Sequence, residues 1–330
     1  LLFLFLMAAG CAASTRETGG CKKDTDCREG RICSDGKCKE SPHRGRCCAC
    51  PDASVPRPPH PRLSLKRAKS RHPWPMFGRD PHRSGASPYT GPEKKPRVDW
   101  KFRAKGPISG GVVVDAAGRV FFGSHDKHLY ALSAEGKLLW KYATGDKIWG
   151  TPALAKDGEL VVVGSDDDHL HAVTAAKGAP VFKVKLGSCN LKAKGAKFKK
   201  RGRAAPEAVR CDVDGSPAVD SKGRVVVGSE GLHLVTPKGE VVATYDAGRH
   251  VRSSPAFRDD GVYLFGARDD RVYAVDEKGK LLWSFVARSD VDSTPVLATD
   301  GTLYVGSDDG RLYAVWPDGE KRWAVVTGGP

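Results

Sequence analysis

The chain has 330 residues, of which 40% are hydrophobic and 28% charged, a balance typical of a globular domain with additional polar segments. Its formal net charge is +15, but the charge is unevenly distributed. Residues 1–96 carry 19 Lys and Arg against 9 Asp and Glu, residues 188–211 carry 8 against 1, and the remainder carries 27 against 29. Because the main body is nearly neutral, a nucleic-acid-binding domain with a basic surface is disfavoured, and we expect no nucleic acid partner.

The N-terminal end predicts export. Residues 1–7 are all apolar but too few to span a bilayer as a helix, and we expect the sequence to begin inside a signal peptide. The following Ala-Ala-Gly-Cys, ending at Cys11, resembles a bacterial lipobox. That resemblance implies a signal and tether over residues 1–20 and a lipid anchor on Cys11. Since Ala12 rather than Asp follows, it also implies an outer-membrane lipoprotein of the bacterial cell envelope. A secretory signal cleaved nearby is the alternative.

Residues 21–50 form a cysteine-rich segment with few apolar residues. Such a segment cannot bury a core and needs cross-links, which in an exported chain are disulfides. Zinc binding is disfavoured because an exported chain reaches an oxidising compartment and only Cys47 and Cys50 have CxxC spacing. The connectivity stays open for the seven cysteines, which are Cys21, Cys27, Cys33, Cys38, Cys47, Cys48 and Cys50.

Residues 51–73 are rich in proline and basic side chains and are typical of a semi-extended linker. The positive charge has two interpretations. It rests on anionic lipid near the anchor, or it belongs to a solvated spacer.

A repeated phrase organises residues 74–330. Its anchoring glycines are spaced 41, 64, 38 and 40 residues apart, so the second interval is one period plus an insertion over 188–211. Each unit contains four short β-patterned runs, and no unit has a helical period. The first run is expected to end in a Ser/Thr-Pro step, and the fourth contains an aromatic residue or Ala four residues after a Gly. The anchors are Gly123, Gly164, Gly228, Gly266 and Gly306, and the four steps are Thr151-Pro152, Ser216-Pro217, Ser254-Pro255 and Thr294-Pro295.

These units resemble the pyrroloquinoline-quinone-like (PQQ-like) repeat family. The resemblance is carried by Ala274-Val275-Asp276 with Gly279 and Trp283, and by the lead-in from Trp74 to Gly85. It implies an all-β chain folded as a β-propeller of four-stranded blades over residues 74–330, with the lead-in as an ordered cap. We expect five complete repeats plus one N-terminal strand at 98–102. Because one strand is surplus, we also expect truncation at both ends and at least six blades in the intact protein.

The insertion over 188–211 is the part of the repeat region that departs most from the repeated pattern. A disulfide between Cys189 and Cys211 would close it at its neck. The loop is either an interaction loop for an acidic partner or lipid surface, a lid, or a tolerated solvated insertion. Its candidate interaction residues are Lys192, Lys194, Lys197, Lys199, Lys200, Arg201 and Arg203.

Two sets of residues are expected at the same ends of the blades as the insertion. The residues two before each Ser/Thr-Pro step are Trp149, Asp214, Arg252 and Asp292, a candidate site for a small polar ligand. Alternatively, Arg252 simply offsets the two acids. The Asp-rich turns after the anchoring glycines could hold Ca²⁺, but turn chemistry alone explains them, and we predict no metal site.

The leading hypothesis is a non-enzymatic, envelope-anchored propeller that serves as a scaffold for protein partners. It is similar to the propeller lipoproteins of outer-membrane barrel assembly, but no partner-contact motif is identified. The rival is a quinoprotein-like oxidoreductase, or a propeller that binds a sugar or another small ligand. Only under that alternative would pyrroloquinoline quinone and calcium be cofactors; otherwise we expect none.

Overall fold

A computed structural model describes residues 31–34, 37–40, 60, 63, 70–91, 95–186 and 212–329. Cys11 and the insertion, including Cys189, Cys211 and the basic interaction residues, lie outside these ranges. The chain divides into two compact units, residues 1–59 and 60–330. Within the first unit, β1 (Arg31–Ser34) and β2 (Lys37–Glu40) form an antiparallel hairpin in which Cys33 is directly opposite Cys38.

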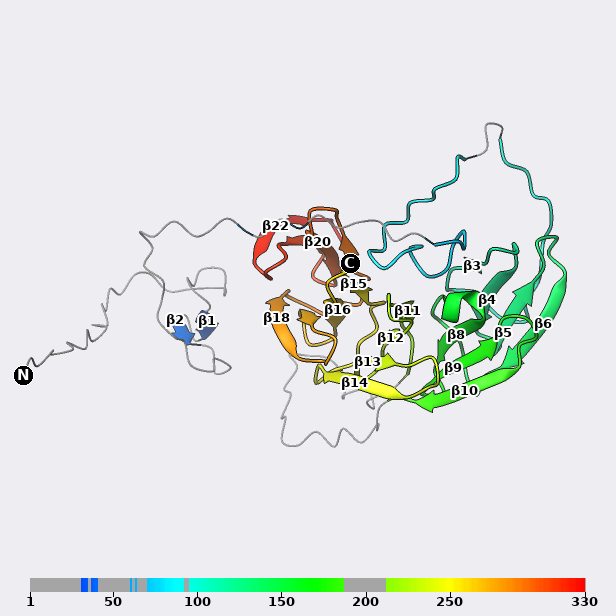
Figure 1. Cartoon of the computed structure of the whole chain (residues 1–330). Helices are drawn as coiled ribbons and strands as arrows, with labels where there is room; N and C mark the ends of the chain where they lie inside the picture. Colours follow the sequence, from blue (N-terminus) through cyan, green and yellow to red (C-terminus); the bar gives the residue numbers. More distant parts are fainter. Residues whose placement is uncertain are drawn as a thin grey trace, which may run out of the picture. The chain divides into compact units, whose positions relative to one another are not determined.

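The second unit contains five four-stranded antiparallel sheets that follow one another along an arc (Figure 1). Each sheet is built from four consecutive strands, so every sheet is one blade, and the predicted all-β propeller is confirmed. The blades are β3 (Val113–Val114), β4 (Val120–Ser124), β5 (His128–Leu132) and β6 (Leu138–Ala143); β7 (Ala153–Ala155), β8 (Leu160–Ser165), β9 (His169–Thr174) and β10 (Pro180–Lys185); β11 (Ala218–Val219), β12 (Val225–Gly228), β13 (Gly231–Val235) and β14 (Val241–Asp246); β15 (Ala256–Phe257), β16 (Tyr263–Ala267), β17 (Arg271–Val275) and β18 (Leu281–Val286); and β19 (Val296–Leu297), β20 (Leu303–Ser307), β21 (Arg311–Val315) and β22 (Lys321–Val326).

Burial within a blade follows the position of the strand. The second strands β8 and β16 are buried along their whole length, because both of their faces lie against neighbouring blades. The fourth strands β6, β10 and β14 instead alternate between exposed and half-buried residues, since only one of their faces meets a neighbour. The core therefore lies between the blades. In the described part of the chain, no helix is long and apolar enough to cross a membrane, and a short 3₁₀ turn, η2 (Lys156–Gly158), is the helical element of the propeller.

The repeated Gly and Trp are the two halves of a joint between successive blades. The Trp140 ring lies against Gly178 of the next blade, where an added Cβ would be 2.6 Å from Trp140 Cε3, and Trp140 Nε1 donates to the Ala175 carbonyl at 3.1 Å. Gly178 has a φ of +66°, so the turn that receives the ring also requires glycine. Trp283 and Gly319 form the same joint between the last two blades.

The Ser/Thr-Pro steps form a second joint. They were expected at the end of each first strand, but that position was wrong: the first strands begin immediately after the proline, which has no N–H to donate to the sheet. Each Ser or Thr hydroxyl instead accepts a hydrogen bond from the backbone of the preceding blade. The row of bonds runs from Gly111 N to Thr151 Oγ1 (2.7 Å), Thr151 N to Ser216 Oγ (2.9 Å), Ser216 N to Ser254 Oγ (2.9 Å) and Ser254 N to Thr294 Oγ1 (3.3 Å).

Among the described residues this row ends at Thr294, and a cavity of about 880 Å³ lies between the first strands of blades one and five. Its lining includes Trp74, Phe77, Val112, Val114 and Val296. Residues 98–102, expected as an extra strand, are not hydrogen-bonded into any sheet in the described part of the chain. Trp100 nevertheless packs on Gly136 and donates to the Ala134 carbonyl at 2.9 Å, as a fourth-strand Trp does.

The lead-in segment joins the first strands of four blades. Its Trp74 forms a bridge with Val114 of β3, and its Pro75 carbonyl accepts from Leu154 N of β7 at 2.8 Å. The carbonyls of Pro81 and His82 accept from β15 and β19. The segment is therefore the ordered cap that the resemblance implied. Parts of the expected linker also contact this unit: the His60 ring stacks on Trp316 and Leu63 N donates to Asp300 O.

Candidate functional site

The turn between the second and third strands carries one structural acid in most blades. The second residue after the Gly-Ser or Gly-Ala anchor accepts a hydrogen bond from a Tyr or His four residues later, which anchors the turn to the third strand. Although burial opposes ionisation, hydrogen bonds from His171 and Lys183 lower the pKa of Asp167. These pairs are Asp126 with Tyr130, Asp167 with His171, Asp269 with Tyr273 and Asp309 with Tyr313.

The four residues that stand two before the Ser/Thr-Pro steps lie at the same ends of the blades as these turns. Arg252 Nε donates to Asp214 Oδ2 at 2.7 Å, and Arg252 Nη1 is 3.9 Å from Asp292 Oδ2. Asp292 is also bound by Arg268, whose Nη2 lies 2.7 Å from Asp292 Oδ2. Three of the four predicted residues thus form one row of alternating charges, in which each arginine has an acidic partner.

Trp149 continues this row through a different acid. Its indole Nε1 donates to Asp166 Oδ2 at 2.9 Å, and its ring centroid is 4.0 Å from that of His125. The structure therefore links Trp149 to Asp214 through Asp166.

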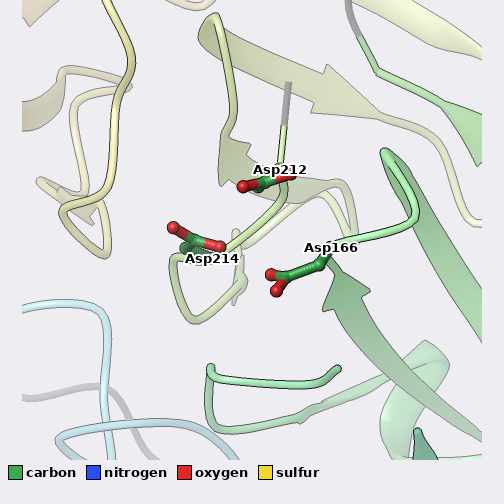
Figure 2. Close-up of side chains that lie close together, drawn as sticks. All are labelled: Asp166, Asp212 and Asp214. Carbon is green, nitrogen blue, oxygen red and sulfur yellow. The ribbon is translucent and has the colours of Figure 1, made fainter. Parts of the chain in front are cut away.

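Asp166, Asp212 and Asp214 form a cluster of carboxylates at the junction of blades two and three (Figure 2). One oxygen from each lies within 4.8 Å of the others. Burial and the neighbouring Asp214 carboxylate raise the pKa of Asp166 to about 7, against the opposing effect of the Trp149 hydrogen bond. An arrangement of this kind needs positive charge, in the form of a proton or another cation.

Sequence reasoning selected Asp214 but did not place Asp166 and Asp212 beside it. A signal for Asp166 existed. At two junctions the first residue after the Gly-Ser or Gly-Ala anchor lies beside the residue two before the next Ser/Thr-Pro step. Asp166 with Asp214 and Arg268 with Asp292 are two examples. Aligning those two positions across the repeats would have predicted the acid pair.

Comparisons with known proteins agree with this architecture. The class is a β-propeller of PQQ-like repeats. The chain belongs to the family described as outer membrane protein assembly factor BamB, whose sequence pattern matches residues 95–196 and 191–330. Among solved structures, BamB from Moraxella catarrhalis is similar, with a TM-score of 0.55 and 19% identity over 68% of this chain. The match spans 66% of the length of that protein. No curated protein matches the sequence significantly.

Proposed function

We propose that this protein is a non-enzymatic scaffold that holds protein partners in the bacterial cell envelope during outer-membrane protein assembly. The observation that carries the proposal is the family match, which extends over all five blades. Lipidation of Cys11 would anchor the scaffold in the outer membrane, and the basic residues of the insertion would contribute to partner binding.

The outer edges of the blades support a role in protein contact. At the start of a fourth strand, adjacent apolar side chains are exposed in three blades: Leu138 and Leu139, Val241 and Val242, and Leu281 and Leu282. Large exposed apolar patches mark protein interaction sites, and these pairs occupy the same strand position in three separate blades. We include these six residues, the outer-strand row, in the proposed contact surface.

Site-specific photo-crosslinking in living cells tests the scaffold. A photoreactive amino acid would replace Leu139, Val242 or Leu282 in turn, with the exposed Ala117 in a first-to-second-strand turn as the matched control position. We expect crosslinks from the outer-strand row to a component of outer-membrane protein assembly, identified by mass spectrometry, and none from position 117. If all four positions behave alike, the outer-strand row is not the contact surface, and absence of any such component contradicts the scaffold.

The insertion and the anchor are tested separately. Replacing the basic residues between 192 and 203 by Ala is expected to weaken the crosslinks, and an unchanged set of partners would remove the loop from the proposal. A Cys11→Ser variant is expected to lose incorporation of radioactive fatty acid and to leave the membrane fraction. Retention of both would contradict lipidation at Cys11.

The rival oxidoreductase has little support from the described blade ends. The carboxylates of pyrroloquinoline quinone would need cationic partners, but Arg252 and Arg268 are already engaged by Asp214 and Asp292. These two arginines are therefore not available for the carboxylates of the cofactor. Addition of pyrroloquinoline quinone with Ca²⁺ should produce no bound chromophore, and a stoichiometric chromophore would restore the rival.

A further inference from the structure

Two junctions between blades bring equivalent positions together but differ in net charge. In each, the first residue of the turn between the second and third strands lies beside the residue two before the next Ser/Thr-Pro step. Between blades four and five these positions hold Arg268 and Asp292, which form an ion pair at 2.7 Å. Between blades two and three they hold Asp166 and Asp214, with Asp212 close by. The second junction therefore has carboxylates where the first has a cation.

The two facing carboxylates are each held from outside. Asp166 Oδ2 accepts from the Trp149 indole at 2.9 Å, and Asp214 Oδ2 accepts from Arg252 Nε at 2.7 Å. Each carboxylate therefore keeps its second oxygen, Oδ1, for another partner. Donors that fix one oxygen of a carboxylate in this way are characteristic of the residues that surround metal ligands.

The remaining oxygens are buried and have no hydrogen-bond partner. Asp166 Oδ1 and Asp214 Oδ1 are both inaccessible and have no hydrogen-bond donor in the described part of the chain other than the opposing carboxyl group, and the Asp214 side chain is only 8% exposed. A buried carboxylate oxygen without a partner is costly. This second observation points to a ligand between Asp166 and Asp214, independently of the number of acids.

The described cations nearby have other partners. Arg252 binds Oδ2 of Asp214, Arg268 binds Asp292, and His250 Nε2 lies 2.8 Å from the backbone carbonyl oxygen of Asp212. In the part of the chain that the structure describes, no side-chain cation is recorded on the inner oxygens of Asp166 and Asp214.

We propose that Asp166, Asp212 and Asp214 bind a divalent cation of the calcium type at the junction of blades two and three. The ligand atoms of these three side chains are all carboxylate oxygens, which favour Ca²⁺ over zinc or copper. Ca²⁺ binds oxygen at about 2.4 Å. Ligand atoms within 4.8 Å of one another can surround an ion at that distance. Water and backbone carbonyls would complete the six to eight ligands that calcium takes. The ion would join Asp166 of blade two to Asp212 and Asp214 of blade three.

Terbium luminescence tests the site, because Tb³⁺ replaces Ca²⁺ and the Trp149 indole touches Asp166. Full-length protein stripped with chelator would be titrated with Tb³⁺ under indole excitation, and Ca²⁺ affinity would be measured by calorimetry. We expect sensitised emission that Ca²⁺ displaces. A Trp149→Phe variant should lose most of the emission while still binding Ca²⁺ by calorimetry. Absence of Ca²⁺ binding to the wild-type protein overturns the proposal. Emission that persists in Trp149→Phe would show that the ion binds at another site, which also overturns it.

Variants locate the ligands. Asp166→Asn and Asp214→Asn should each weaken Ca²⁺ binding by about tenfold or more, since both remove a negative ligand. Asp269→Asn is the matched control, because Asp269 also has a buried Oδ1 without a partner but lies outside the cluster. If Asp214→Asn does not fold, Asp166→Asn decides, because Asp166 lacks the arginine partner of Asp214. Unchanged affinity in a folded Asp166→Asn protein, or equal loss in Asp269→Asn, overturns the proposal.

Discussion

Two junctions, one between blades two and three and one between blades four and five, have the same backbone geometry but different charged side chains. Both bring two side chains together at the blade ends, because the repeat places the same backbone positions there. Arg268 and Asp292 neutralise each other, whereas Asp166 and Asp214 do not. The repeat therefore determines which positions meet, while the individual side chains determine whether the charges at a junction are balanced or need a cation.

Converting the complete junction into the acidic one should have the largest effect. In Arg268→Asp, Asp292 loses its paired arginine and gains a like charge, so we expect the free energy of unfolding in chelator to fall by about 2 to 3 kcal/mol. Urea denaturation measures this. The Arg268→Gln control, which removes the pair without adding an acid, should lose only about 1 kcal/mol. Equal losses in the two variants would show that repulsion contributes nothing at this junction.

Protonation of His233 changes the free energy of unfolding below pH 6.5, so the stabilities of variants at the two junctions are best compared above that pH. Burial lowers the pKa of His233 from 6.5 to about 4, and its ring lies between Ser229 Oγ and Thr244 Oγ1. The unfolded chain therefore takes up this proton at higher pH than the folded chain, so the contribution of His233 to stability is complete above pH 6.5 and is lost as the pH falls toward 4. Between pH 7 and pH 5 we expect a loss of about 2 kcal/mol from this group.

A His233→Gln variant separates this effect from the carboxylates. Its free energy of unfolding at pH 7 is expected to be lower, but relative to the wild-type protein it should gain about 2 kcal/mol between pH 7 and pH 5, because the loss from His233 is absent. Parallel pH profiles for the two proteins would contradict the assignment to His233.

Converting the acidic junction into the complete one should stabilise the protein. Asp166→Arg places a cation opposite Asp214, as Arg268 is placed opposite Asp292, and we expect a gain of about 1 kcal/mol in chelator. Added Ca²⁺ should raise the melting temperature of the wild-type protein but not that of the variant. A variant that Ca²⁺ stabilises as strongly as wild type would show that Asp166 is not a ligand.

The smallest effect is expected from the donor that holds Asp166. Trp149→Phe keeps most of the ring but removes the indole N–H, so the free energy of unfolding should fall by about 0.5 to 1 kcal/mol. In an Asp166→Asn background the same change should cost less, because the bond to an ionised acceptor is already gone. Thermal unfolding of the four proteins in this double-mutant cycle measures the coupling, and strict additivity would contradict it.

Much of the fold was predictable because each repeat uses the same packing contacts with its neighbour. The Gly-to-Trp spacing of four residues reflects a joint in which each blade offers a glycine turn to the previous aromatic ring and its own aromatic ring to the next turn. The position of the Ser/Thr-Pro steps was wrong because sequence periodicity does not show that the hydroxyl of Thr151 or Ser216 bonds to a neighbouring blade. The strand expected at 98–102 is likewise not seen in the described sheets, although Trp100 occupies the place that the repeat predicts.

The linear sequence determined the blades, their number of strands and the side chains at their ends, because these depend on alternation and turn chemistry over a few residues. It also brought Trp149, Asp214, Arg252 and Asp292 to one set of blade ends, since they occupy equivalent positions in successive repeats. Only the tertiary structure decided which of them meet, and that Asp166 and Asp212 join Asp214. Asp166 and Asp214 are separated by the 188–211 insertion and come from different blades, so no local pattern connects them. Their electrostatics depend on burial and distance, which exist only after the blades have packed.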